Sequence, residues 1–194
     1  PPLTPSPLYA LASRPLPPEF CAALRHACGA ALLDSGRRAA ERGRCDLLGV
    51  WPEATLTVGP DERGSDFLQR LRENLAQLGE AALPAGVELP FAGGLIGYLS
   101  YDFGRHLEQV SRLAVDDLHL PDARLGLYAW ALVSDHLAHT SQLVFHPVLA
   151  DSERQRLIAL FSHATGDTPT TFKLQGTMAP DLSVDAYQQA ILRI

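Results

Sequence analysis

Asp34-Ser35-Gly36 combines residue types that suit the binding of a small polar ligand. A short carboxylate accepts hydrogen bonds from an ammonium group, while a serine hydroxyl and nearby backbone amides can bind a carboxylate. Such a set fits the zwitterion of a free amino acid. The same residues are also common in an Asx or Ser turn that ends a strand. Arg44 is the next candidate, either lining such a pocket or forming a surface ion pair.

The other polar residues match no catalytic or metal-binding motif. Seven histidines are scattered along the chain without ligand spacing such as H-E-x-x-H. Ser35 beside Asp34, or Ser100 beside Asp102, would need a distant histidine to form a hydrolase triad, and neither serine lies in G-x-S-x-G. The three cysteines form no C-x-x-C pair. We therefore predict no catalytic residue, no disulfide framework and no metal site in this chain.

Residues 89–105, LPFAGGLIGYLSYDFGR, place three glycines inside an apolar run. Glycines within a strand indicate a bulge, a bend or close approach of a neighbouring backbone. A phosphate-binding loop is the competing interpretation, but it requires G-x-G-x-x-G before a helix, or a lysine followed by Ser or Thr. Here the glycines lead into Tyr98, Leu99, Ser100 and Tyr101, which continue the strand pattern. We therefore expect a core strand.

The hydrophobic pattern predicts the elements around these residues. Short strands are expected at 30–33, 45–51, 54–58, 125–133 and 142–145, with the last two paired as a hairpin. Helices are expected from Pro17 or Pro18 to Cys28, from a Ser65 cap to a Gly79 stop, over 151–163, and from a Ser183 cap to Ile194, where the helix is still running.

This order of elements predicts an α+β fold with antiparallel β-sheets packed with outer helices, because strands and helices do not alternate as in a βαβ array. We divide the chain into a proline-rich lead-in at 1–18, an α+β domain at 19–165, a polar linker at 166–182 and a helix start at 183–194. With 194 residues, 46% of them hydrophobic, the chain can bury a substantial core.

Composition also limits the partners. The 22 acidic and 16 basic residues give a formal charge of −6, and no basic run is present, which argues against nucleic acid. The sequence has neither a long apolar span nor a secretory signal. We therefore expect a soluble, cytoplasmic protein with no membrane partner.

Three segments together resemble the amino-terminal region of the chorismate-utilising aminating enzymes, which include aminodeoxychorismate synthase component I and anthranilate synthase component I. The first is the glycine-containing run at 89–105. The second is ALLDSG at 31–36 with GRCDLLG at 43–49, similar to the family's leucine–acid–serine turn and the strand after it. The third is LPD at 120–122 with LYAWALVSDH at 127–136, whose Tyr-x-Trp and Asp-His are closer to the aminodeoxychorismate branch. The resemblance covers most of residues 8–194.

The resemblance implies a tryptophan pocket that the leucine–acid–serine element helps to line. On this basis we assign the pocket to Leu33, Asp34, Ser35 and Arg44, with Cys45 as a packing neighbour. Asp34 stands where the anthranilate branch usually has Glu, so its carboxylate reaches one methylene less far.

The resemblance further implies that this chain is a non-catalytic amino-terminal domain, inactive alone and without a cofactor of its own. The full-length enzyme would use Mg²⁺, and ammonia from a glutamine amidotransferase subunit, component II. It would convert chorismate to 4-amino-4-deoxychorismate for para-aminobenzoate and folate biosynthesis. Two alternatives remain open: the amino-terminal domain of anthranilate synthase component I with a tryptophan feedback site, and an autonomous amino acid-binding module.

Overall fold

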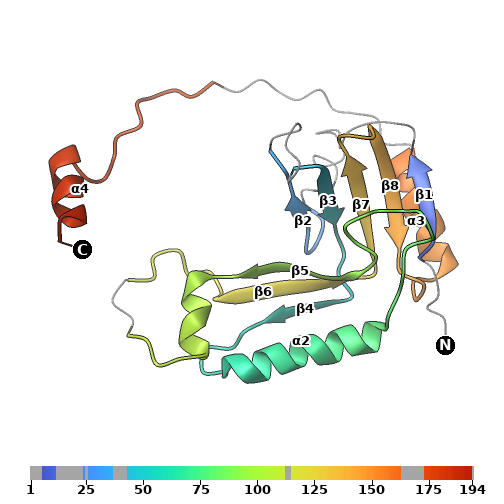
Figure 1. Ribbon diagram of the computed structural model, residues 1–194, viewed down its shortest axis with the longest axis horizontal. Coiled ribbons are helices and arrows are strands. Elements are labelled where there is room, and N and C mark those ends of the chain that lie inside the picture. The colour runs from blue at the N-terminus through green and yellow to red at the C-terminus, as the bar shows by residue number, and fades with distance from the viewer. Residues whose placement is uncertain are drawn as a thin grey trace.

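The protein is described by a computed structural model over residues 6–11, 24, 26–36, 43–111, 115–162 and 173–193. Two antiparallel sheets form its centre (Figure 1). The strands are β1 (Leu8–Leu11), β2 (Ala31–Leu33), β3 (Cys45–Gly49), β4 (Ala54–Thr57), β5 (Gly94–Leu99), β6 (Ala123–Tyr128), β7 (Trp130–Asp135) and β8 (Thr140–Phe145). The helices are α2 (Gly64–Leu78), α3 (Asp151–Ser162), α4 (Val184–Ile191) and a 3-10 helix over Tyr101–His106.

The larger sheet has the strand order β1-β8-β7-β3-β2, and the smaller sheet has the order β4-β6-β5, so the predicted α+β class is confirmed. Strands of the smaller sheet run across those of the larger one, and α2 lies along the smaller sheet (Figure 1). Both sheets leave an edge strand, β2 and β5 respectively, on the side where the candidate site lies.

Alternation along the strands separates two cores on the larger sheet, because successive side chains point to opposite faces. On one face, Leu48 and Trp130 pack with Leu157 of α3. On the other face, Leu47 and Val133 pack with Ile96 of the smaller sheet. A third core, with Phe67 and Leu71 among its members, joins α2 to the far side of the smaller sheet. The predicted packing of a sheet with an outer helix is therefore confirmed at α2.

One predicted strand, at 125–133, is wrong as a single element. The chain leaves the smaller sheet after Tyr128 and enters the larger sheet at Trp130, so Ala129 forms a corner between β6 and β7. The backbone oxygen of Ala129 accepts a hydrogen bond from the His146 amide at 2.7 Å. All three residues at the corner are buried, so the apolar run gives no sign of a break. The hairpin of β7 and β8 is confirmed.

The glycine-containing run forms β5, and the predicted close backbone approach is confirmed at Gly97, where a Cβ would overlap the backbone of Arg124 and Leu125. The strand nevertheless ends at Leu99, so its expected continuation through Tyr101 is wrong. The following residues turn into the 3-10 helix, which brings the Phe103 ring to 5.7 Å from that of Phe67. Burial of this ring under α2 explains the turn.

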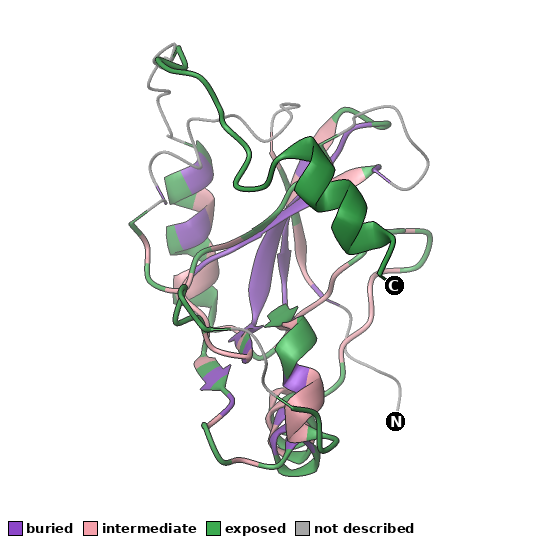
Figure 2. Ribbon diagram, turned by 90° about the vertical axis from the view of Figure 1, so that its left-hand side faces the viewer, coloured by how far each residue is buried: buried purple, intermediate pink, exposed green. Residues whose placement is uncertain are grey.

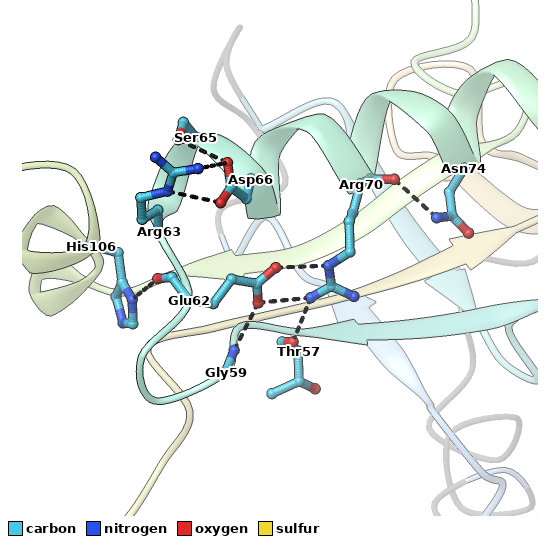
Figure 3. Close-up of polar contacts among 9 residues, drawn as sticks. All are labelled: Thr57, Gly59, Glu62, Arg63, Ser65, Asp66, Arg70, Asn74 and His106. Carbon is cyan, nitrogen blue, oxygen red and sulfur yellow. Dashed lines mark hydrogen bonds and ion pairs between the residues drawn. The ribbon is translucent and has the colours of Figure 1, made fainter.

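Helix α2 begins differently from the prediction, because its N-cap is Arg63 and not Ser65. Ser65 already lies inside the helix, and its hydroxyl donates to Asp66 Oδ1 at 3.2 Å (Figure 3). Asp66 also pairs with Arg63 across the first turn, at 2.9 Å. The predicted stop at Gly79 is confirmed, with φ of 86° and its amide bonded to the Leu75 oxygen at 3.1 Å.

The last two helices, α3 and α4, agree more closely with the prediction from the sequence. Helix α3 is confirmed, with Leu157 and Phe161 buried. Ser183 caps α4 by accepting from the Ala186 amide at 3.2 Å, as predicted, but the helix ends at Ile191 instead of running on. Figure 2 shows α4 exposed along its length. The helix predicted before Gly29 lies mostly outside the described residues, as do the lead-in and much of the linker. Within the described part, no helix combines the length and apolarity needed to cross a membrane.

Candidate functional site

A cavity of about 800 Å³ lies between the edges of the two sheets. Strands β2 and β3 of the larger sheet and β5 of the smaller sheet contribute to its wall, and the connection between α2 and β5 completes it. The lining residues are Leu33, Arg44, Cys45, Leu47, Leu83, Val87, Glu88, Leu89, Pro90, Phe91, Leu95, Ile96 and Gly97. The volume is within the range of small-molecule sites, and a mostly apolar lining with few polar groups is typical of them.

Leu33 is the apolar member of the predicted pocket, and the structure places it in the wall. Its side chain is 53% exposed, so it has surface left to contact a ligand. It pairs with Leu47 across β2 and β3, and both residues line the cavity. Leu32 pairs with Leu48 instead, on the opposite face of the sheet.

Arg44 lines the cavity and also forms an ion pair, so both roles expected for it coexist. Its Nε and Nη2 atoms lie 2.8 and 2.7 Å from Asp135 Oδ2. The other carboxylate oxygen of Asp135 accepts from the amides of Leu137 and Ala138 at 2.9 and 3.0 Å. The hydrogen bond from Arg44 is the main reason that the pKa of Asp135 is lowered. Because Asp135 stays ionised, it holds the guanidinium in one orientation at the cavity wall.

Asp34 and Ser35 lie beside the cavity but outside its lining. Asp34 Oδ1 accepts from the Gly36 amide at 2.7 Å, which is the geometry of an Asx turn. The Ser35 hydroxyl donates to the Cys45 oxygen at 2.6 Å, and the Ser35 amide donates to Asp46 Oδ1 at 2.9 Å. Both residues therefore shape the turn that follows Leu33.

Cys45 lines the cavity next to Arg44. Burial, and then the nearby Asp135 carboxylate, raise the pKa of its thiol. A protonated thiol is a poor nucleophile and behaves as a small apolar group. This environment suits the packing role expected from the sequence.

The histidine–carboxylate pairs of the fold do not form a hydrolase site. His136 Nε2 lies 2.7 Å from Asp46 Oδ2, but the Ser35 hydroxyl beside this pair donates to a backbone oxygen. His106 uses both ring nitrogens, with the Glu62 oxygen at 2.8 Å and Asp122 at 3.0 Å, so neither is left for Ser100. A triad requires a serine hydroxyl hydrogen-bonded to the histidine, and neither serine meets this condition.

No group of three His, Cys, Asp or Glu side chains within the described ranges could hold a metal ion. These residues therefore do not fit the Mg²⁺ expected for the full-length enzyme.

The connection at 83–91 contributes residues that the sequence interpretation missed, among them Glu88 and Phe91. They precede the glycines of β5, and no sequence motif marks them as site residues. Their place opposite β2 and β3 depends on how the two sheets pack, which no local pattern specifies.

The structure thus has an α+β fold with a cavity of small-molecule size, and comparison with known proteins gives its family. The sequence pattern of the family described as chorismate binding enzyme matches residues 29–194. This chain therefore belongs to the chorismate-binding enzyme family.

Individual relatives agree with this assignment. The chain is 35% identical over 134 residues to aminodeoxychorismate synthase component 1 of Escherichia coli, covering 63% of this chain and 29% of the relative. It is 30% identical over 176 residues to the Klebsiella aerogenes protein of the same name, covering 85% and 38%. It is 33% identical over 132 residues to anthranilate synthase component 1 of Mycolicibacterium smegmatis, covering 62% and 25%. The chain thus spans well under half the length of these relatives.

Proposed function

We propose that this chain is the amino-terminal, non-catalytic part of an aminodeoxychorismate synthase component 1. The match to the chorismate-binding family over residues 29–194 is the observation that carries this proposal. The name of the Escherichia coli and Klebsiella aerogenes relatives supports the branch, and so does the Tyr-x-Trp and Asp-His pattern at 128–136.

In this proposal the full-length protein converts chorismate to 4-amino-4-deoxychorismate for para-aminobenzoate and folate synthesis. Ammonia comes from a glutamine amidotransferase subunit, and Mg²⁺ binds outside the residues described here. The chain alone is inactive, because within the described ranges no three His, Cys, Asp or Glu side chains are grouped so that they could hold a metal ion, and its sequence contains a single lysine, Lys173. Chemistry on chorismate needs positioned acids, bases and a metal.

Product identification tests the reaction. The full-length gene product and this chain are each incubated with chorismate, ammonium and Mg²⁺, and the products are separated by chromatography and identified by mass spectrometry. We expect 4-amino-4-deoxychorismate from the full-length protein and no turnover by the chain. Anthranilate as the product would assign the protein to the other branch, and turnover by the chain alone would contradict its non-catalytic role.

We further propose that the cavity binds tryptophan or a similar amino acid. The apolar lining offers burial for a large side chain, while Arg44, held by Asp135, offers donors to a carboxylate. Ser35 and Asp34 contribute through the turn that positions Leu33.

Two leucines on opposite faces of β2 make a matched test of this site. Replacing Leu33 by Ser removes apolar contact from the cavity. Full burial of a leucine is worth about 1.5–3 kcal/mol, and because Leu33 is already half-buried, ligand contact should contribute about 1–2 kcal/mol. We expect Leu33→Ser to weaken tryptophan binding to the full-length gene product by roughly five- to thirtyfold in calorimetry. Leu32→Ser, at a similarly exposed position facing away, should leave the affinity within about twofold. Equal losses from both changes would contradict the assignment.

A further inference from the structure

We propose that Glu88, and not Asp34, binds the ammonium group of the ligand and makes the cavity selective for free amino acids over simple carboxylic acids. This inference rests on the proposed amino acid-binding function and adds the residue that determines its specificity.

The cavity presents one charge of each sign. Among its described lining residues, Arg44 and Glu88 are the two that carry an ionised side chain. They come from different walls, since Arg44 directly precedes β3 while Glu88 lies in the connection between α2 and β5. Their charges attract each other electrostatically, although no direct ion pair joins them within the described part of the chain. A zwitterion can bridge such a pair with its own two charges.

The other carboxylates near the cavity are already engaged. Asp34 lies outside the lining and accepts from the Gly36 amide at 2.7 Å. Asp135 is occupied by Arg44 and two backbone amides. Asp46 accepts from the Ser35 amide and contacts His136 at 2.7 Å. Glu88 is exposed and makes no hydrogen bond to another described residue, so its carboxylate is available to a ligand.

Arg44 is arranged to take the opposite end of the ligand. Its Nε and Nη2 atoms are used by Asp135, and among the described contacts Nη1 is left for a ligand carboxylate. A molecule that carries only a carboxylate would satisfy Arg44 but would leave Glu88 unpaired beside a second negative charge. Placing like charges together is a common way in which a site rejects a wrong ligand.

Three ligands with the same ring system separate these contributions in calorimetry on the full-length gene product. Tryptophan carries both charges, tryptamine only the ammonium and indole-3-propionate only the carboxylate. We expect Glu88→Gln to weaken the binding of tryptophan and tryptamine about ten- to a hundredfold, the usual value of a charge-assisted hydrogen bond. The affinity for indole-3-propionate should stay unchanged or increase. Asp34→Asn removes the same charge but keeps the oxygen that accepts from the Gly36 amide, so the turn that positions Leu33 is preserved and all three affinities should shift by less than about twofold.

An equal loss for all three ligands in Glu88→Gln, or an ammonium-dependent loss in Asp34→Asn, would overturn the assignment of Glu88 while tryptophan still bound the wild-type protein. Failure of the wild-type protein to bind tryptophan would instead remove the proposed function on which the inference rests.

Discussion

At the scale of single residues, Gly93 lets the connection after α2 pass close to the larger sheet. Its φ is +112°, a conformation that side-chain-bearing residues rarely adopt, and a Cβ there would lie 2.8 Å from His146 Cδ2. His146 is only 4% exposed, so its ring has no open space to move into. Gly93 therefore sets the course of the segment that carries Glu88.

We expect Gly93→Ala to lower the free energy of unfolding by about 1–3 kcal/mol, because the backbone strain and the contact with His146 both act on the folded state. Gly104→Ala is the matched control, since a Cβ there meets nothing within 4 Å. Denaturant unfolding of both variants measures the difference. If the two changes have the same effect, the crowding at Gly93 is not what requires glycine.

His146 makes stability depend on pH. Burial lowers its pKa below the usual value of 6.5, and its Nδ1 accepts from the Val148 amide at 3.2 Å, so the folded protein favours the neutral ring. As the pH falls, His146 takes up a proton in the unfolded chain before it does so in the folded protein. The contribution of neutral His146 to stability is therefore full above pH 6.5 and is lost as the pH falls toward the lower, folded-state pKa.

We therefore expect the unfolding free energy of wild type to drop as the pH falls below 6.5, and His146→Asn to show a shallower slope in that window. Asn can still accept from the Val148 amide. His139→Asn removes an exposed histidine with φ of 53°, a conformation that Asn tolerates, and should keep the wild-type slope. Identical slopes in wild type and His146→Asn would rule out this titration.

At the scale of elements, the turn between β7 and β8 holds the start of β3 from two sides. Asp135 pairs with the Arg44 side chain, and the His136 amide donates to the Arg44 oxygen at 2.8 Å. The His136 ring contacts Asp46, which in turn accepts from Ser35. One hairpin turn thus fixes both strands, β2 and β3, that contribute to the cavity wall.

Asp46→Asn should lower the unfolding free energy by about 1–3 kcal/mol, because a buried charge-assisted contact to His136 is lost. We also expect faster amide exchange at residues 31–36 and 43–49, measured by mass spectrometry. Asp34→Asn, an exposed change on the same loop, should alter neither quantity. Unchanged exchange in Asp46→Asn would show that the turn does not hold these strands.

Elements set by local rules could be predicted from the sequence. The Gly79 stop needs only a residue that accepts positive φ, and the Ser183 cap needs only a hydroxyl near the first amides. Ser65 is not the cap, because the helix already begins at Gly64. The corner at Ala129 gave no local signal, since burial on both sides hides a change of sheet. Leu33, Arg44 and Cys45 came from a motif, while Glu88 depends on the packing of the two sheets.

At the scale of the whole molecule, α4 presents large apolar side chains to solvent. Val184, Tyr187 and Ile191 recur at helical spacing and are 69%, 59% and 51% exposed. Tyr98 and Leu99 at the end of β5 are also exposed. Exposed apolar surface of this kind favours association. We therefore expect the isolated chain to self-associate, and we expect another part of the full-length protein to cover this surface.

Light scattering over a dilution series measures this association, with a hydrophobic dye as a second readout. The double change Tyr187→Glu and Ile191→Glu should shift the chain toward monomer, because it places charges on the apolar face of α4. Gln188→Glu and Gln189→Glu add the same charge elsewhere on the helix and should have a smaller effect. A wild-type chain that is monomeric at all concentrations and binds no dye would contradict the prediction.

Hydrogen exchange of the full-length gene product with and without tryptophan tests most directly whether the cavity between the two sheets is an amino acid site. Ligand in the cavity should slow amide exchange at residues 33–36, 43–47 and 83–97, which hold the lining and its supporting turn. Residues 115–122, which line a separate hollow, should be unaffected. Protection confined to other segments, or no protection at saturating tryptophan, would contradict the account.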